Sequence, residues 1–125
     1  MLTPDRSSLA DAYESLLQTT GENLFTGTTN TTLVAVFTNG DFTPAQLSHL
    51  AQMASAGLAR SIDPVFTTAD GDTVYAVSVG SDPEKVAASL DAVGALSARL
   101  VEEAIADAVL AAKMPERSFL KMLRR

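Results

Sequence analysis

The sequence predicts a layered α/β fold. Two short runs rich in β-branched residues, 30–39 and 73–79, are each bounded by turn-forming residues, which is typical of strands. The segment between them, from Pro44 to the Asp63-Pro64 pair, has apolar residues at helical spacing. Two strands joined through a helix indicate a β-α-β unit, in which we expect the first strand to be buried.

The first predicted element is a helix over residues 4–18. Thr3 is placed to cap this helix, and Pro4 suits its first position. The apolar residues that share one face are Leu9, Ala12, Tyr13 and Leu16. Residues 19–23 then break the helix, and the Thr/Gly-rich segment 24–30 leads irregularly into the first strand.

The middle helix has a complete start signal. Thr43 is placed as the N-cap, Pro44 as the first helical residue and Gln46 as the return partner of a capping box. Its apolar stripe consists of Leu47, Leu50, Ala51, Ala54 and Leu58. Gly57 weakens a helix by about 1 kcal/mol relative to alanine, so we expect a close packing contact at this position.

The second strand is predicted to alternate, and a long helix is predicted after it. Val74, Ala76 and Ser78 are expected on one face of that strand, and Thr73, Tyr75, Val77 and Val79 on the other. Ser81 and Glu84 have capping-box spacing, and nothing from Lys85 to Lys113 breaks the helical pattern except a tolerable Gly94. The expected core stripe is Val86, Leu90, Val93, Leu100, Ala104 and Ala108. The alanine-rich face indicates close packing on a sheet, with a helix–helix contact between subunits as the alternative.

Composition excludes several kinds of site and partner. The 125 residues suit one domain, and the absence of cysteine excludes disulfides, thiolate metal sites and cysteine nucleophiles. The single histidine, His49, is expected at the surface and leaves little room for a zinc site or a histidine-based triad. The net charge of −6 argues against nucleic acid and anionic membranes as partners. No apolar run approaches the roughly 20 residues of a membrane helix and no signal peptide is visible, so a cytoplasmic location is expected.

Two features could carry chemistry. Thr31, at the mouth of the first strand, becomes a usable nucleophile if the Asn30–Thr31 bond is cut, because the freed α-amine has a pKa of about 7.7–8.0 and can act as the base. Pattern alone favours an ordinary strand-start threonine. Asp70 and Asp72 flank Gly71 at the entrance of the second strand, where they could hold an ammonium group or tune a proton transfer. The alternative for this pair is a plain turn.

Three segments in matching order and separation resemble a known family. The segments are Asn30–Asn39, Ala45–Arg60 and Asp70–Ala76, and the resemblance spans about residues 24 to 112. They are similar to the C-terminal part of the DmpA-type self-processing aminopeptidases, which include L-aminopeptidase/D-esterases and β-peptidyl aminopeptidases. This resemblance implies a four-layer α/β/β/α sandwich, similar to the N-terminal-nucleophile hydrolases but different in connectivity, with no cofactor and no metal.

The resemblance also implies roles for individual residues. Family members cleave themselves just before a Ser or Thr, which then becomes the N-terminal nucleophile. By position this residue is Thr31, with Asn30 on the leaving side. Asp72 matches the acidic residue that the family carries near the nucleophile, and Asp70 stands where some members have serine.

The family's larger N-terminal segment has no counterpart here beyond a short tail. We expect residues 1–30 to be the end of that segment and residues 31–125 to be the catalytic β-chain portion. The predicted fold is thus an incomplete piece with two main strands and three to four helices, completed by the missing segment or by other copies in a homo-oligomer. The expected function is hydrolysis of small peptides, amides or esters, with almost no activity in this chain alone. The alternative is a non-catalytic α/β oligomerisation domain or a truncated remnant.

Overall fold

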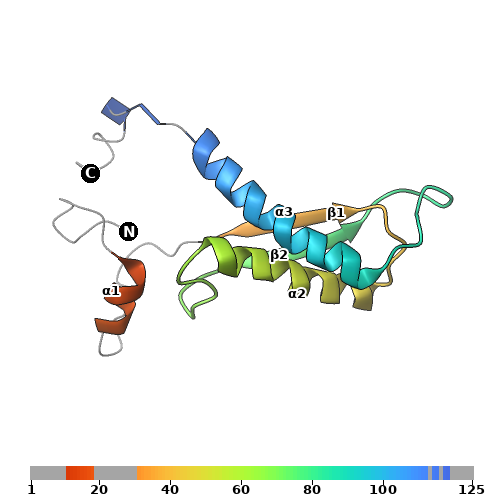
Figure 1. The fold of residues 1–125 in the computed structure, drawn as a ribbon, viewed down its shortest axis with the longest axis horizontal. Coiled ribbons are helices and arrows are strands. Elements are labelled where there is room, and N and C mark those ends of the chain that lie inside the picture. The colour runs from red at the N-terminus through yellow and green to blue at the C-terminus, as the bar shows by residue number, and fades with distance from the viewer. Residues whose placement is uncertain (1–10, 19–30, 113, 116, 119–125) are drawn as a thin grey trace.

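Two strands and two helices make up the folded body of the protein. The computed structural model describes residues 11–18, 31–112, 114–115 and 117–118. The elements in order are α1 (Ala12–Gln18), β1 (Leu33–Thr38), α2 (Pro44–Ser61), β2 (Thr73–Ser78) and α3 (Leu90–Ala111). In Figure 1 the strands lie side by side and α2 and α3 run along one face of them. The predicted α/β class is confirmed, and in the described residues it has one sheet layer and one helix layer.

The sheet is a parallel pair with α2 as its crossover. β1 and β2 pair in register from Leu33 opposite Thr73 to Thr38 opposite Ser78. The Thr73 N–H extends the ladder by donating to the Thr32 carbonyl oxygen over 2.9 Å. The predicted β-α-β unit is therefore confirmed. Parallel strands require such a crossover, because a tight turn cannot join them.

The start of α2 is fixed by its own side chains, as predicted. The Thr43 N–H donates to Gln46 Oε1 over 2.9 Å, and the Gln46 N–H donates to Thr43 Oγ1 over 3.3 Å. This reciprocal pair is a capping box, and Pro44 fills the first helical position. The helix ends at Ser61, shortly before Pro64. Its fully buried face consists of Leu50, Ala54, Gly57 and Leu58, while His49 is exposed as expected.

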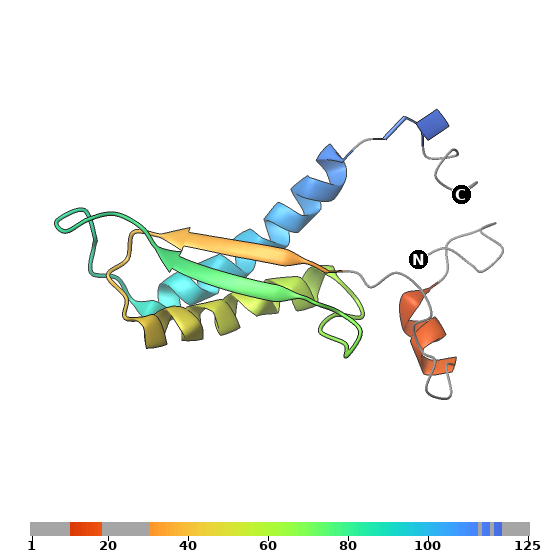
Figure 2. The same ribbon diagram turned by 180° about the vertical axis from the view of Figure 1, so that it is seen from behind.

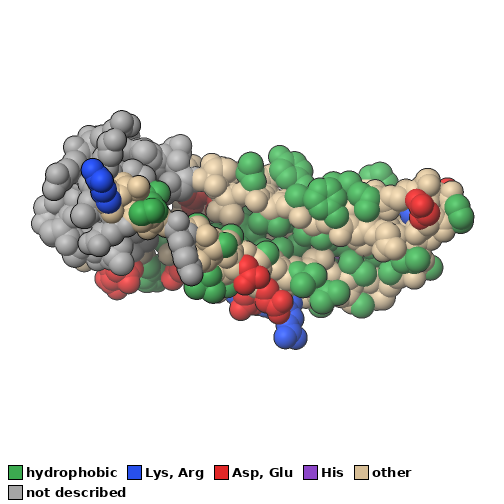
Figure 3. All heavy atoms as spheres, turned by 90° about the horizontal axis from the view of Figure 1, so that it is seen from above, with side chains coloured by type: hydrophobic (Ala, Val, Ile, Leu, Met, Phe, Trp, Pro, Cys, Tyr) green, Lys and Arg blue, Asp and Glu red, His purple; other side chains and the backbone are tan. Residues whose placement is uncertain are grey.

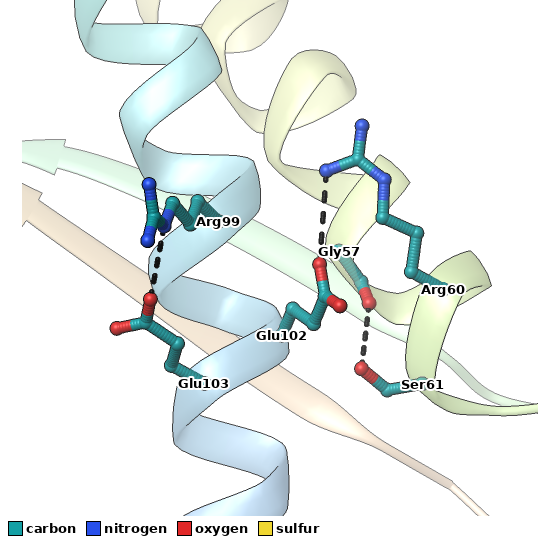
Figure 4. A network of polar contacts seen from close by, with 6 residues as sticks. All are labelled: Gly57, Arg60, Ser61, Arg99, Glu102 and Glu103. Carbon is teal, nitrogen blue, oxygen red and sulfur yellow. Dashed lines mark hydrogen bonds and ion pairs between the residues drawn. The ribbon is translucent and has the colours of Figure 1, made fainter.

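Small residues let α2 and α3 approach closely. A Cβ at Gly57 would overlap the Ala98 carbonyl oxygen and the Val101 side chain, which explains a glycine inside this helix. Two exposed ion pairs lie near the crossing: Arg60 of α2 contacts Glu102 of α3, while Arg99 and Glu103 pair within α3 (Figure 4). Exposed pairs of this kind contribute at most about 1 kcal/mol. Close apolar contact, rather than charge, therefore holds the two helices together.

The last helix begins later than predicted. Ser81 and Glu84 do form the expected side-chain contacts, with the Ser81 N–H and Oγ both 3.0 Å from Glu84 Oε2, but they close a turn instead of starting a helix. The chain then pairs with the segment after β1, because the Val86 N–H donates to the Asn39 carbonyl oxygen over 2.9 Å. α3 starts only at Leu90, with Ser89 as its N-cap.

The buried stripe of α3 also differs from the predicted one. Its fully buried residues are Gly94, Ser97, Ala98 and Val101. Leu90 and Val93 are half-buried, in line with the prediction. Leu100 and Val86 are about half exposed, and Ala104 and Ala108 are exposed, so the predicted stripe was wrong at these four positions. The reason is steric, since the close approach to α2 selects the smallest side chains of α3 and turns the larger ones outward.

One face of the sheet is uncovered, so β1 is only half buried and the expectation of a buried strand was wrong. Both strands stand in front of the helices in Figure 2, and no described element lies over them. The inward residues Val34, Val36 and Val74 pack on the helical core. The outward residues are 40–69% exposed: Leu33, Phe37, Tyr75, Val77 and Val79. We call these five residues the open sheet face. The alternation predicted for β2 agrees with this division.

Further apolar surface lies elsewhere on the body. In the view from above Figure 1, hydrophobic side chains are spread over the part of the body that grey atoms do not cover, and acidic and basic side chains gather in a cluster at its lower edge (Figure 3). The C-terminal end of α3 contributes Val109 and Leu110, each at least 70% exposed. Contiguous apolar surface of this kind marks interaction sites in soluble proteins. Among the described residues, no helix has the length and apolar character to cross a bilayer.

α1 is shorter than the predicted helix over residues 4–18. Asp11 caps it, since its Oδ1 accepts the Tyr13 N–H over 2.9 Å and the Glu14 N–H over 3.1 Å. An N-cap residue stands just before the first helical residue, so α1 begins after Asp11. The predicted start at Thr3 and Pro4, and the approach to the strand over 24–30, lie outside the described residues.

The glycine in α2 gives a direct test of the helix packing. Gly57→Ala is expected to lower the free energy of unfolding by about 1–3 kcal/mol, because overpacking exceeds the gain of about 1 kcal/mol in helix propensity. Urea denaturation measures the difference. The exposed neighbouring position supplies the control, since Ala56→Gly tests propensity alone and should cost about 1 kcal/mol. A stabilising Gly57→Ala would contradict the packing described here.

Candidate active site

Thr31 lies at the exposed entrance of β1, and the residue after it fixes its position. The Thr32 N–H donates to Asp72 Oδ1 over 2.7 Å, and the Thr32 carbonyl oxygen accepts the Thr73 N–H over 2.9 Å. The backbone of Thr32 is thus held at both polar groups by the start of β2. Asn30, on the other side of Thr31, lies outside the described residues.

The side chain of Thr31 rests against the glycine of the Asp70-Gly71-Asp72 segment. The register that pairs Leu33 with Thr73 continues backwards to set Thr31 opposite Gly71. A Cβ placed on Gly71 would lie 2.7 Å from Thr31 Oγ1. The hydroxyl of the predicted nucleophile therefore lies directly beside the backbone at the entrance of β2.

Asp72 serves as a double backbone acceptor in this arrangement. Besides the Thr32 N–H, its carboxylate accepts the Phe66 N–H at Oδ2 over 3.2 Å. Desolvation acts to raise the pKa of Asp72, but the hydrogen bonds from the Thr32 N–H, the Phe66 N–H and the Thr32 side chain together hold this pKa below its ordinary value. The group is thus a carboxylate at neutral pH, which makes it suited to positioning the chain and unsuited to donating a proton.

Asp70 is turned toward a different partner. Its Oδ2 accepts the Thr67 N–H over 3.0 Å and the Thr67 hydroxyl over 2.7 Å. Asp70 and Asp72 thereby bind the consecutive amides of Thr67 and Phe66, and together they brace that loop. The structure brings Thr31, Gly71 and Asp72 together, and among the described residues no hydrogen bond joins Asp70 to Thr31.

Phe66 is a residue of this site that the sequence pattern did not indicate. Its φ of 56° lies in the left-handed region, which is unusual for a bulky residue, and its side chain is 47% exposed. The bond from its N–H to Asp72 supports this conformation. Strained backbone of this kind clusters at functional sites. A single aromatic residue in a short loop carries no local sequence signal for such a conformation.

The arrangement supplies a positioned hydroxyl and an ionised carboxylate. In the described part of the chain, no group of three or more His, Cys, Asp or Glu side chains lies close enough to hold a metal ion. A threonine hydroxyl acts as a nucleophile when a base lies beside it, and the α-amine of an N-terminal threonine can be that base. Donors for an oxyanion would have to come from outside the residues named above.

The lowered pKa of Asp72 predicts a pH-dependent contribution to stability. Because the folded state binds the proton of this group more weakly than the unfolded state, the contribution is present at neutral pH and is lost as the pH falls below about 4. Urea denaturation of the wild type and Asp72→Asn should show a deficit for the variant at pH 7 that shrinks toward pH 2. Asp107→Asn, at an exposed position of α3, is the control. A deficit that stays constant over this pH range would contradict the assignment.

Comparison with known proteins gives a consistent family. A sequence profile of peptidase family S58 matches residues 5–118. A 6-aminohexanoate-oligomer endohydrolase from Kocuria sp. (strain KY2) is 30% identical over 88 residues, which cover 63% of this chain and 25% of that protein. An uncharacterized aminopeptidase from Mycobacterium tuberculosis (strain H37Rv) is 37% identical over 95 residues, which cover 67% of this chain and 28% of that protein.

A third relative has a shorter and closer match. An uncharacterized aminopeptidase from Mycobacterium leprae (strain TN) is 44% identical over 52 residues, which cover 42% of this chain and 14% of that protein. No solved structure matches the chain. The chain spans only about a quarter of the length of relatives such as the Kocuria protein, at 25%. The family predicted from the three motifs is confirmed, and the chain belongs to peptidase family S58.

Proposed function

We propose that this chain is the β-chain portion of a self-processing hydrolase that removes N-terminal residues from small peptides, amides or esters. The observation that carries the proposal is the contact of Thr31 with the Asp70-Gly71-Asp72 segment, with Thr32 bound to Asp72. Two of the three segments that suggested the family in the sequence, Asn30–Asn39 and Asp70–Ala76, thus meet beside one hydroxyl. Aminopeptidase is also the name given to two of the relatives.

The proposed chemistry begins with cleavage of the Asn30–Thr31 bond. Thr31 Oγ1 attacks the Asn30 carbonyl carbon, the chain shifts from nitrogen to oxygen, and water hydrolyses the resulting ester. The products are a carboxylate on Asn30 and a free α-amine on Thr31. That amine then accepts the hydroxyl proton as Oγ1 attacks a substrate carbonyl, and it returns the proton to the leaving amine or alcohol. Water releases the acyl group and restores Thr31.

In this proposal Asp72 positions the nucleophile. Its carboxylate fixes the Thr32 amide and hence the orientation of the backbone at Thr31, just before the strand begins. Asp70 acts one step further away, through the loop at Thr67. Substitution of Asp72 should therefore impair catalysis more than substitution of Asp70.

The open sheet face supports the proposal that the chain is incomplete alone. Five apolar side chains on a two-stranded sheet leave more apolar surface in water than such a small unit tolerates well. We propose that the unmatched part of the relatives includes an N-terminal segment that supplies a second sheet against this face, which gives the four-layer α/β/β/α sandwich. The same segment would supply oxyanion donors, each of which contributes about 2.7–4 kcal/mol in comparable sites.

The relatives' names bear on the substrate. The Kocuria relative is named for the hydrolysis of 6-aminohexanoate oligomers, in which amide bonds join the units. We propose amides of short, flexible acids or amino acids as the substrates to test first. The acidic chain, with its net charge of −6, suits substrates that present a free ammonium group better than anionic ones.

A non-catalytic role is the second candidate, and the open sheet face also favours it. Packing two copies face to face would bury the same five side chains without any chemistry at Thr31. The two candidates differ in what Thr31 does. The catalytic role requires its hydroxyl, while the oligomerisation role does not.

Intact-mass measurement tests the catalytic proposal. The full chain is expressed alone and together with the preceding segment of the Mycobacterium tuberculosis relative. With that segment present, we expect a split at Asn30–Thr31 and hydrolysis of aminoacyl-p-nitroanilides, both lost in Thr31→Ala. The chain alone should show at most a trace of hydrolysis, because in this proposal the oxyanion donors belong to the added segment.

Thr68→Ala provides the control for removing a threonine hydroxyl at an exposed position of the neighbouring loop. It should leave both cleavage and hydrolysis unchanged. Absence of cleavage and hydrolysis in the mixture, with a folded complex present, would contradict the catalytic proposal and favour the oligomerisation role. A robust Thr31-dependent rate from the chain alone would contradict the proposed dependence on the added segment.

A further inference from the structure

We propose that Gly71 is a positioning residue that leaves room for the side chain of Thr31. A glycine is needed either for a left-handed backbone or for space. Gly80, with a φ of 102°, is the only described glycine in the left-handed region. Gly71 has a backbone that any L-residue can adopt, so its requirement is one of space.

The space beside Gly71 is occupied by one residue. A Cβ built at this position would lie 2.7 Å from Oγ1, 3.3 Å from Cγ2 and 3.6 Å from Cβ of Thr31, and these are its three nearest atoms. The situation at Gly57 is different, because there the obstacles are a main-chain carbonyl and a core side chain. A side chain at position 71 would thus meet the proposed nucleophile before anything else.

Hydrogen bonds prevent the backbone segments around Thr31 and Gly71 from moving apart. The Thr73 hydroxyl donates to the Gly71 carbonyl oxygen over 3.0 Å, and the Thr73 N–H binds the Thr32 carbonyl oxygen over 2.9 Å. Asp72 holds the Thr32 amide from the same segment. An added methyl group at 71 would therefore act on the softest coordinate, which is rotation of Thr31 about χ1 into another staggered well.

The functional meaning of this contact rests on the proposed function. In a nucleophilic threonine, the hydroxyl must face both the α-amine and the substrate carbonyl, and a misplacement of about 1 Å can cost about 10²-fold in rate. Gly71 thus sets the direction of the Thr31 hydroxyl, while Asp72 sets the position of its backbone. Gly71 itself touches no substrate in this scheme.

The test is Gly71→Ala in the full chain, with a readout that does not need activity. Three-bond scalar couplings of Thr31 measured by NMR report χ1 in the wild type and in the variant. We expect the dominant rotamer to change while signals from α2 and α3 stay in place. Cleavage at Asn30–Thr31 in the presence of the relative's N-terminal segment should slow by about 10²-fold. Unchanged couplings in a folded variant would overturn the inference.

The outcomes separate this inference from the proposed function. If the wild type is never cleaved but the Thr31 rotamer changes in Gly71→Ala, the positioning contact stands and the catalytic proposal fails. If the wild type and Gly71→Ala are cleaved at the same rate, the proposed function stands and the positioning role is overturned.

If Gly71→Ala fails to fold, a double variant still tests the contact. In the Thr31→Ala background an alanine at 71 has room, because Oγ1 and Cγ2 are gone. Recovery of folding in the double variant Gly71→Ala/Thr31→Ala supports the contact, and a chain unfolded in both backgrounds overturns it.

Discussion

The hydrogen bond from the Thr32 N–H to the Asp72 carboxylate is the constraint on which the site depends. It joins the entrances of two strands that lie 40 positions apart in the sequence. Together with the parallel register, it brings Thr31 against Gly71 and leaves the Thr31 hydroxyl at the exposed end of the sheet. Because Asp72 also binds Phe66, one carboxylate fixes the strand, the turn and the adjoining loop. These bonds fix the backbone at the strand entrances beside a single hydroxyl.

The rest of the fold supports these strand entrances, because its helices pack against one face of the two strands. The tight crossing at Gly57 and Ala98 packs α2 and α3 as a single layer behind the sheet. On the opposite side of the sheet, the five apolar side chains of the open sheet face remain exposed. An exposed apolar face of this kind is suited to packing against a second layer. The relatives are longer proteins, since the matched part makes up only 25% of the Kocuria protein and 28% of the Mycobacterium tuberculosis protein.

Much of this organisation could be predicted from the sequence because it rests on local signals. The capping box at Thr43 and Gln46, the two β-branched strands and the close contact at Gly57 were all predicted and are confirmed. The start of α3 was predicted wrongly, because the capping-box spacing of Ser81 and Glu84 also suits an isolated turn. The pairing of Val86 with the segment after β1 is a non-local contact that no local pattern indicates. The buried stripe of α3 was predicted only in part, at Leu90 and Val93, because the contact with α2 selected small side chains over large ones further along the helix. At the site, motif order indicated Thr31 and Asp72, but only the register reveals what Gly71 contacts and that Asp70 faces Thr67.

The central claim is that the Thr31 hydroxyl at the entrance of β1 is a nucleophile. Its most direct test is covalent labelling of the full chain, combined with the N-terminal segment of a family member, by a β-lactone that acylates N-terminal nucleophiles. Peptide mapping by tandem mass spectrometry then locates the acyl group. The claim predicts one acyl group on Thr31, at the start of a peptide whose N-terminus is Thr31 itself. Labelling at other hydroxyls, or a Thr31 that stays unlabelled within an uncut peptide, would contradict it.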